Sequence, residues 1–260
     1  MKSICPNHDL FSKLSLIEKL HIDGIELEMN SKENPEKKKK NLTETFSSSS
    51  IKLSAIHLGF LGELQSTRFL QRRKAIEKTK QFLKVCAELG GIGVITIPSQ
   101  FKRAKPGLTS RSAKKIKAKI AEVYGKLGEY AQDVGAYIIL EPIDHTLVDF
   151  INTCSEAVDI IKMTGSDMVK ICPDFHHMSI EEPAISSKII EFASYIKHIH
   201  INDDGFEKTL SKLPGEGSLD FSSIINSLKE IKYQNCLSFD CGIPNEEKLL
   251  TSIELVKKLI

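Results

Sequence analysis

The sequence has no strong excess of charge of either sign. Its 36 lysines and arginines nearly balance its 34 aspartates and glutamates, which leaves a formal net charge of +2 over 260 residues. A chain this close to neutral generates no strong field that would gather nucleic acid or an anionic membrane surface. We therefore expect a small molecule as the partner, with neither a nucleic acid nor a membrane.

The features of secreted and membrane proteins are also missing. The N-terminus MKSICPNHDL has no apolar stretch of signal-peptide length, and the longest apolar runs elsewhere are far shorter than a membrane span. The cysteines show no C-x-x-C spacing, and three of them lie inside apolar, strand-like runs; they are Cys5, Cys86, Cys154, Cys172, Cys236 and Cys241. Such a pattern is typical of buried free thiols, so we expect a reducing compartment and a cytoplasmic protein.

Short apolar or β-branched runs alternate along the chain with longer segments of helical period. This alternation predicts a parallel sheet with helices packed outside it. The predicted strands are 2–5, 24–29, 51–58, 92–98, 136–141, 168–172, 196–201 and 235–240. The predicted helices are 8–21, 35–46, 67–89, 110–134, 152–163, 180–194, 220–231 and 246–259. Eight strands and eight helices predict a single α/β domain over residues 1–260, a (β/α)8 TIM barrel, and α/β barrels are commonly about 250 residues long.

An open, doubly wound sheet is the alternative architecture. That fold is expected to carry a glycine-rich turn after its first strand, whereas CPNHDLF, which follows the first predicted strand here, contains no glycine. The lysine run 37–40 is read as a solvated helix face, and the serine run 47–50 as a loop between a helix and a strand. Neither suggests a domain linker, so the barrel is favoured.

Four residues that end or follow apolar, β-branched runs carry most of the functional information: Glu141, Asp174, His200 and Asp240. In a (β/α)8 barrel the active site lies at the carboxyl ends of the strands, so these side chains are expected to meet. Taken singly, each has an ordinary structural explanation as a helix cap, an ion-pair partner or a core histidine. Together, and with no surplus of arginines to pair them, clustered carboxylates would repel one another unless a cation lay between them. We predict one metal site.

The predicted ligands also limit the choice of metal. Three carboxylates and one imidazole make a hard, oxygen-rich site, which suits Mn²⁺ best, or Mg²⁺ or Co²⁺, and differs from a closed thiolate zinc site. Zn²⁺ stays an alternative. His198 lies on the same face of its strand as His200 but further from the mouth, so we expect it in the core or behind the ligands.

Three further residues are predicted to line the mouth and contact substrate. His177 lies three residues beyond Asp174, on a loop or first helical turn, where it could hydrogen-bond a substrate oxygen; a surface histidine is the alternative. His57 closes the third predicted strand, and Glu26 or Glu28 closes the second, although a glutamate there is equally typical of an ion pair with a helix. The segment LPGEGSLDF (213–221) is predicted to be a loop entering a helix, with glycines that permit close approach of the backbone.

Several short motifs link these positions to a known family. They are DGIELE at 23–28, LEP at 140–142, D-x-x-H followed by M-x-I-E-E at 174–182, HIHINDD at 198–204 and PGEGSLDF at 214–221. Over nearly its whole length the chain resembles the xylose isomerase-like TIM barrel family. That family includes ketose 3-epimerases, hydroxypyruvate isomerases and inosose dehydratases, with endonuclease IV as a more distant relative.

The resemblance implies roles for individual residues. Glu141, Asp174, His200 and the acid at 240 would bind one divalent cation, His177 would contact the substrate, and Glu141 and Asp240 would act on a substrate proton. The family usually has glutamate at the last of these positions, and the aspartate is shorter by one C–C bond, about 1.5 Å. The arginine often seen before P-G-x-G is replaced by Lys208 and Lys212. Family members often form dimers or tetramers, so a homodimer or tetramer is expected.

The implied activity is proton transfer next to a carbonyl of a sugar, a polyol or a sugar phosphate, with a divalent metal as cofactor. We predict an isomerase or epimerase. A metal-dependent dehydratase of the inosose or dehydroshikimate type is one alternative, and a non-catalytic sugar-binding barrel with a degenerate site is another. An endonuclease IV-like nuclease is disfavoured, because a multinuclear zinc site needs more histidines and carboxylates and a near-neutral chain attracts phosphate weakly.

Overall fold

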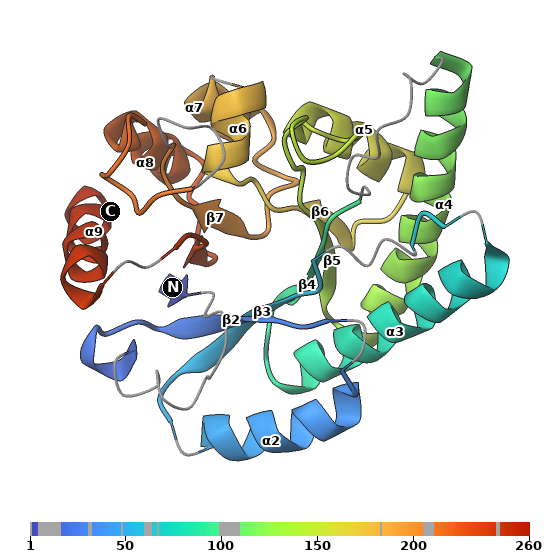
Figure 1. The fold of residues 1–260 in the computed structure, drawn as a ribbon, viewed down its shortest axis with the longest axis horizontal. Helices are drawn as coiled ribbons and strands as arrows, with labels where there is room; N and C mark the ends of the chain where they lie inside the picture. Colours follow the sequence, from blue (N-terminus) through green and yellow to red (C-terminus); the bar gives the residue numbers. More distant parts are fainter. Residues whose placement is uncertain are drawn as a thin grey trace.

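The computed structural model describes residues 2–4, 17–30, 33–47, 49–59, 64–66, 68–98, 110–182, 184–204, 211–242 and 245–260. Eight parallel strands form one sheet in the order β6-β5-β4-β3-β2-β1-β8-β7 (Figure 1). The outermost strands meet through isolated parallel bridges that pair Ile171 with Ile196 and Asp174 with His200. The sheet therefore closes on itself, and the predicted (β/α)8 barrel is confirmed.

Each strand lies inside its predicted range and is a little shorter. The strands are β1 Lys2–Ile4, β2 Gly24–Glu28, β3 Lys52–His57, β4 Gly93–Thr96, β5 Tyr137–Leu140, β6 Val169–Ile171, β7 Ile199–Ile201 and β8 Leu237–Phe239. Side chains of β4, β7 and β8 are buried throughout. That is the reason the sequence shows continuous apolar runs, because strands covered by helices have no solvent face.

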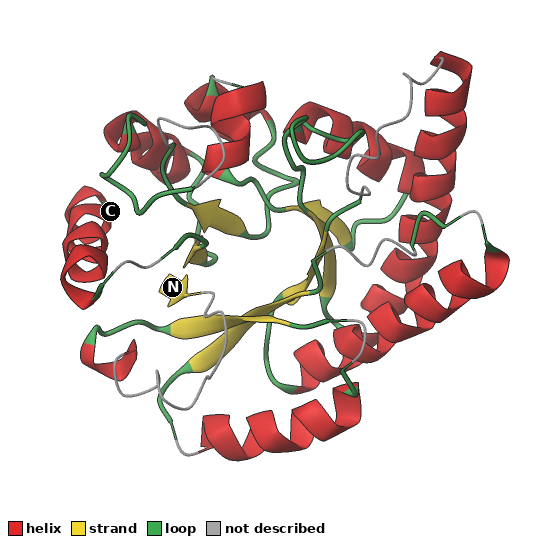
Figure 2. Ribbon diagram, in the orientation of Figure 1, coloured by secondary structure: helices red, strands yellow, loops and turns green. Residues whose placement is uncertain are grey.

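The helices surround the barrel (Figure 2). They are α2 Pro35–Ser47, α3 Phe69–Glu88, α4 Ser110–Val134, α5 Cys154–Thr164, α6 Phe175–Glu181, α7 Ile185–Glu191, α8 Phe221–Glu230 and α9 Glu246–Leu259. Residues 8–16 of the first predicted helix lie outside the described residues. No helix within the described ranges is long and apolar enough to cross a membrane.

One prediction about the helices is wrong. The sequence predicts a single helix over 180–194, but the structure has α6 at 175–181 and a separate α7 at 185–191. Helix α6 begins directly after Asp174, because the side chain of that residue accepts a hydrogen bond from the backbone N–H of His177 and caps the helix. This cap fixes the direction in which His177 leaves the barrel mouth.

Inside the barrel, apolar and polar side chains occupy different sectors. Ala55, Ile95 and Ile139, from β3, β4 and β5, form a small apolar cluster with Cys172, which follows β6, and this cluster is separate from the main core. The buried polar residues Glu26, His198, His200 and Ser238 come instead from β2, β7 and β8 or their immediate neighbours. The cysteines of the described ranges are free, as predicted, and all but Cys241 are buried; Cys5 lies outside those ranges.

Candidate metal centre and active site

The structure brings the four predicted ligands together at the carboxyl ends of the strands. Glu141 follows β5, Asp174 lies three residues past β6, His200 lies in β7 and Asp240 follows β8. One candidate ligand atom from each lies within 4.8 Å of the others. We call Glu141, Asp174, His200 and Asp240 the four-residue cluster.

A single imidazole nitrogen lies at the centre of this cluster. Nδ1 of His200 is 2.7 Å from Oε1 of Glu141, 3.4 Å from Oδ2 of Asp240 and 3.7 Å from Oδ2 of Asp174. Glu141 and Asp174 are each 2% exposed, and His200 is fully buried. The Asp240 side chain, in contrast, is 41% exposed. The cluster is thus closed on three sides and open to solvent at Asp240.

The close packing of acids and imidazoles shifts their proton affinities. Burial opposes ionisation of Glu141, but His200 and His57 outweigh it and hold the pKa of this carboxyl well below its usual range. Partial burial and the carboxylates of Glu141 and Asp174 raise the pKa of Asp240 to about 6. Among these carboxylates, repulsion therefore raises the pKa of Asp240, the member of the cluster that faces solvent.

His57 lies against Glu141 at the edge of the cluster. Its Nε2 is 2.7 Å from Oε2 of Glu141, so the two oxygens of this carboxylate face two different histidines. The Glu141 carboxylate overcomes the effect of burial and raises the pKa of His57 to about 9. His57 keeps 14% of its side chain exposed, so it is partly accessible to solvent and also restrains the Glu141 carboxylate.

His177 points away from its helix toward a carboxylate that the sequence reasoning missed. Nδ1 of His177 is 2.7 Å from Oδ2 of Asp144, which is 1% exposed, whereas 16% of the His177 side chain is exposed. Burial is outweighed by the carboxylates of Asp174 and Asp144, and the pKa of His177 rises to about 9. The signal for Asp144 was its place three residues after Glu141, in the same loop.

Asn202 is a second residue that sequence reasoning missed. Its side-chain N–H₂ donates to Oδ2 of Asp174 at 2.8 Å and to the backbone carbonyl of Asp240 at 3.0 Å. Its side-chain oxygen accepts the backbone N–H of His176. Alternation along the strand from His198 and His200 places Asn202 on the same face, which was the available signal. This amide links the ends of β6 and β8 to the start of α6.

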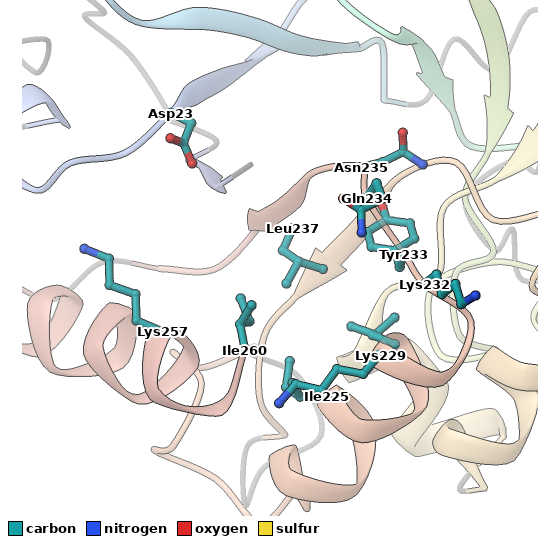
Figure 3. Close-up of a pocket in the computed structure, with 11 residues that line it drawn as sticks. Asp23, Ile225, Lys229, Lys232, Tyr233, Gln234, Asn235, Leu237, Lys257 and Ile260 are labelled. Carbon is teal, nitrogen blue, oxygen red and sulfur yellow. The ribbon is translucent and has the colours of Figure 1, made fainter.

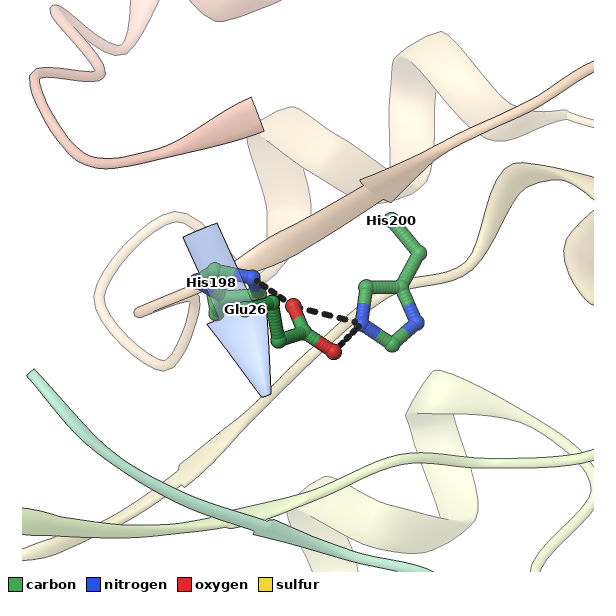
Figure 4. Close-up of side chains that lie close together, drawn as sticks. All are labelled: Glu26, His198 and His200. Carbon is green, nitrogen blue, oxygen red and sulfur yellow. Dashed lines mark hydrogen bonds and ion pairs between the residues drawn. The ribbon is translucent and has the colours of Figure 1, made fainter. Parts of the chain in front are cut away.

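Glu26 requires a correction. It was predicted to contact substrate because of its place near the end of the second strand, yet it is fully buried. Its carboxylate accepts hydrogen bonds from Nε2 of His198 at 2.7 Å and from Nε2 of His200 at 3.1 Å (Figure 4). With no exposed surface and two histidine partners, Glu26 lies behind His200 rather than at the mouth. The placement of His198 in the core is confirmed by its full burial.

The PGEG segment is anchored by a carboxylate beside the cluster. Asp203 accepts backbone N–H groups from Gly215, Gly217 and Leu219 at 2.9 to 3.0 Å. A Cβ on Gly217 would lie 2.2 Å from the carbonyl oxygen of Asp204. The glycine is therefore required for close approach of two backbone segments, and the predicted loop entering helix α8 is confirmed.

A cavity of about 550 Å³ lies at the other end of the barrel (Figure 3). It is lined by residues that precede strands, such as Asp23 before β2 and Asn235 before β8, and by Lys229, Lys232 and Lys257 from the helix side. None of the four-residue cluster lines it. Its position at the strand starts is the end of a (β/α)8 barrel associated with stability rather than catalysis.

The xylose isomerase-like TIM barrel family matches residues 14–259. The chain belongs to this family. The inosose isomerase of Bacillus velezensis is 30% identical over an alignment of 264 positions. The alignment covers 96% of this chain and 89% of that protein. The 3-dehydro-D-guloside 4-epimerase of Escherichia coli K12 is 28% identical over 193 residues, covering 73% and 70% of the two chains.

Solved structures agree on the fold. A structure described as IOLI protein with a bound zinc atom superimposes with a TM-score of 0.77 and 23% identity, over 100% of this chain and 96% of that chain. The curated relatives are epimerases and isomerases, and they support an enzyme of the isomerase or epimerase class.

Proposed function

We propose that this protein is a divalent-metal-dependent sugar isomerase or epimerase that transfers a proton next to a carbonyl. The observation that carries the proposal is the convergence of the four-residue cluster on Nδ1 of His200. The relatives named as epimerases and isomerases support the reaction class, and their substrates support a small sugar or an inosose as the ligand.

The residues of the cluster fit a hard divalent cation. Within the described part of the chain, the ion pairs of its carboxylates are all made to histidines, and lysine and arginine are absent from them. Placing two nearly buried carboxylates next to a third, more exposed one costs free energy unless a bound cation offsets their repulsion. Oxygen-rich coordination favours Mn²⁺, with Mg²⁺ and Co²⁺ as alternatives, and the zinc in a neighbouring structure keeps Zn²⁺ among the metals to test.

The side chains around the cluster divide the work of catalysis. A cation held there would polarise the substrate carbonyl and stabilise the charge of an enediolate. Glu141 takes the proton from the adjacent carbon, and His57 holds its carboxylate through Oε2. His177 is held at Nδ1 by Asp144, which leaves Nε2 to donate to a substrate oxygen. Asp240, at the open side, donates a proton of its own to the opposite face of the substrate, and both acids exchange protons with solvent before the next turnover.

The length of Asp240 motivates a second candidate function. The aspartate is about 1.5 Å shorter than a glutamate, and its backbone is fixed by Asn202 and Ser211, which both donate to its carbonyl oxygen. If its carboxylate does not reach the substrate carbon, Glu141 is the single base, and the carbanion expels a β-hydroxyl. The outcome is then dehydration of an inosose or a related polyol ketone.

Incubation of the Mn²⁺-loaded protein with ketoses, their phosphates and an inosose in D₂O distinguishes these functions. An epimerase or isomerase incorporates deuterium next to the carbonyl and forms a new isomer, which mass spectrometry and chromatography detect. A dehydratase gives a product lighter by one water. Glu141→Gln should remove either activity. Sugar binding without deuterium uptake or water loss would instead favour the non-catalytic barrel and overturn the proposal.

A further inference from the structure

A fully buried carboxylate lies directly behind the four-residue cluster. Both oxygens of Glu26 lie 3.1 to 3.2 Å from Nε2 of His200, and Oε2 is also 2.7 Å from Nε2 of His198. All three side chains are 0% exposed. Figure 4 shows the Glu26 carboxylate between the two imidazole rings, of His200 in β7 and of His198 directly before β7. Glu26 itself lies in β2, 172 and 174 residues away in sequence.

The two nitrogens of His200 have separate partners. Nε2 faces Glu26, and Nδ1 faces Glu141, Asp174 and Asp240. An imidazole that binds a metal through one nitrogen generally donates its other N–H to a carboxylate, a carbonyl or water, which fixes the ring orientation and strengthens the ligand. Glu26 is placed to accept that N–H and so to leave Nδ1 as the ligand atom.

The burial of Glu26 is costly unless it serves such a role. Its direct neighbour in the β2–β3 register is Ala55, which belongs to the apolar cluster inside the barrel. An apolar residue at position 26 would extend that cluster, and replacing a buried charge by a well-packed apolar group is often neutral or stabilising. A carboxylate is present here instead, hydrogen-bonded to both His198 and His200.

We infer that Glu26 is a positioning residue that orients His200 for cation binding, and that His198 holds Glu26 in place. The inference rests on the proposed function, because it requires a cation at the four-residue cluster. A different interpretation is a metal ion bound directly by Glu26, His198 and His200, whose ligand atoms also lie within 4.8 Å of one another. Full burial and the existing hydrogen bonds argue against it, and the stoichiometry of binding separates the two.

Calorimetric titration of the metal-free protein with Mn²⁺ tests the inference. Glu26→Gln keeps the size of the side chain and removes its charge, and we expect a dissociation constant raised about 10- to 100-fold, still with one ion per chain. Thr96→Val is the matched control. Thr96 is fully buried on β4, and its side chain bonds Tyr124 of α4 at 2.7 Å. Its contact with the cluster is made by its backbone carbonyl, which the substitution keeps and which accepts the N–H of Glu141. We expect this control to lower the Tm and leave the dissociation constant unchanged.

If Glu26→Gln does not fold, His198→Phe replaces it, since this change removes the donor to Glu26 but keeps the contact between Glu26 and His200. A smaller rise of the dissociation constant is expected. Affinity in Glu26→Gln equal to that of the unaltered protein would overturn the inference alone and leave the proposed function standing. Two ions per chain, one of them lost with Glu26, would also overturn it. Absence of binding by the unaltered protein would overturn the proposed function and, with it, this inference.

Discussion

The two ends of the barrel differ in how their polar groups are held. At the carboxyl ends of the strands, buried acids, histidines and an amide bond one another within a tightly packed cluster. At the strand starts, a cavity of about 550 Å³ is lined partly by exposed lysines on flexible side chains. None of the residues of the four-residue cluster lines this cavity. Fixed, convergent polar groups therefore identify the candidate site better than the presence of a cavity does.

The difference has a physical cause in the residues behind the cluster. Asn202 ties Asp174 to the end of β8, Asp144 holds His177, and Glu26 holds His200. Each of these supports is 1% exposed or less. Buried hydrogen bonds of this kind restrict side-chain orientation, and such partners of metal ligands typically contribute 10- to 100-fold in affinity or activity.

The largest expected effect is at the strand-end cluster itself. Asp174→Ala removes a predicted ligand and should weaken Mn²⁺ binding by more than about 100-fold. This loss exceeds the one expected when a residue that only hydrogen-bonds a ligand is removed. It also removes the cap of α6, which costs about 1 kcal/mol. Asp174→Asn is the matched control, because asparagine is an equally good cap without the charge. Titration calorimetry should show weak binding in both variants. Both lose an acceptor for Asn202, so the Tm should fall in both, and further in the alanine variant, which also loses the cap. Unchanged affinity in both would exclude Asp174 as a ligand.

A smaller effect is expected from the amide that links the strand ends. Asn202→Ala should raise the Mn²⁺ dissociation constant about 10-fold or more and reduce the free energy of unfolding by roughly 1–3 kcal/mol, since it leaves buried groups unsatisfied. Ser252→Ala serves as the control, because Ser252 is equally buried but bonds the carbonyl of Pro214 outside the cluster. A similar loss of affinity in both variants would show that general destabilisation, not Asn202, is responsible.

The third prediction concerns pH and the open side of the cluster. The pKa of Asp240 rises from 3.8 to about 6 on folding, so the native state binds this proton more tightly than the unfolded state. The resulting stabilisation is complete below about pH 4 and is lost as the pH rises through 6. Metal-free Asp240→Asn avoids this loss. Allowing for the 41% exposure of the side chain, we expect it to be more stable at pH 8 by roughly 1 kcal/mol.

Thermal denaturation without metal, at pH 4 and at pH 8, checks this prediction. The gain of about 2–4 °C in Tm should appear at pH 8 and be absent at pH 4. A gain that is equal at both pH values would show that charge repulsion at Asp240 is not its source.

The smallest effects are expected at the opposite end. Lys229→Ala and Lys257→Ala change exposed residues that line the cavity, and such surface changes usually alter stability by less than about 0.5 kcal/mol. Neither should alter Mn²⁺ affinity or catalytic rate. A large loss of activity in either variant would contradict the assignment of function to the strand ends alone.

Much of the barrel could be predicted from the sequence because its signals are local. Apolar runs located every strand, and the polar residues at the ends of four of them converge because parallel strands of a closed barrel finish at one face. The start of helix α6 was missed because Asp174 was interpreted only as a metal ligand, whereas its side chain also caps this helix. Glu26 was misplaced because its partners lie 172 and 174 residues away. No local pattern reveals which strand-end carboxylate turns inward toward β7.

The central claim is that one cation binds among Glu141, Asp174, His200 and Asp240. Anomalous diffraction from crystals of the Mn²⁺-loaded protein tests it most directly. We predict one peak, within bonding distance of the three carboxylates and of Nδ1 of His200. A peak on the Glu26 side of His200, a peak between Asp144 and the histidines of α6, or no peak in protein that has full access to Mn²⁺ would contradict it.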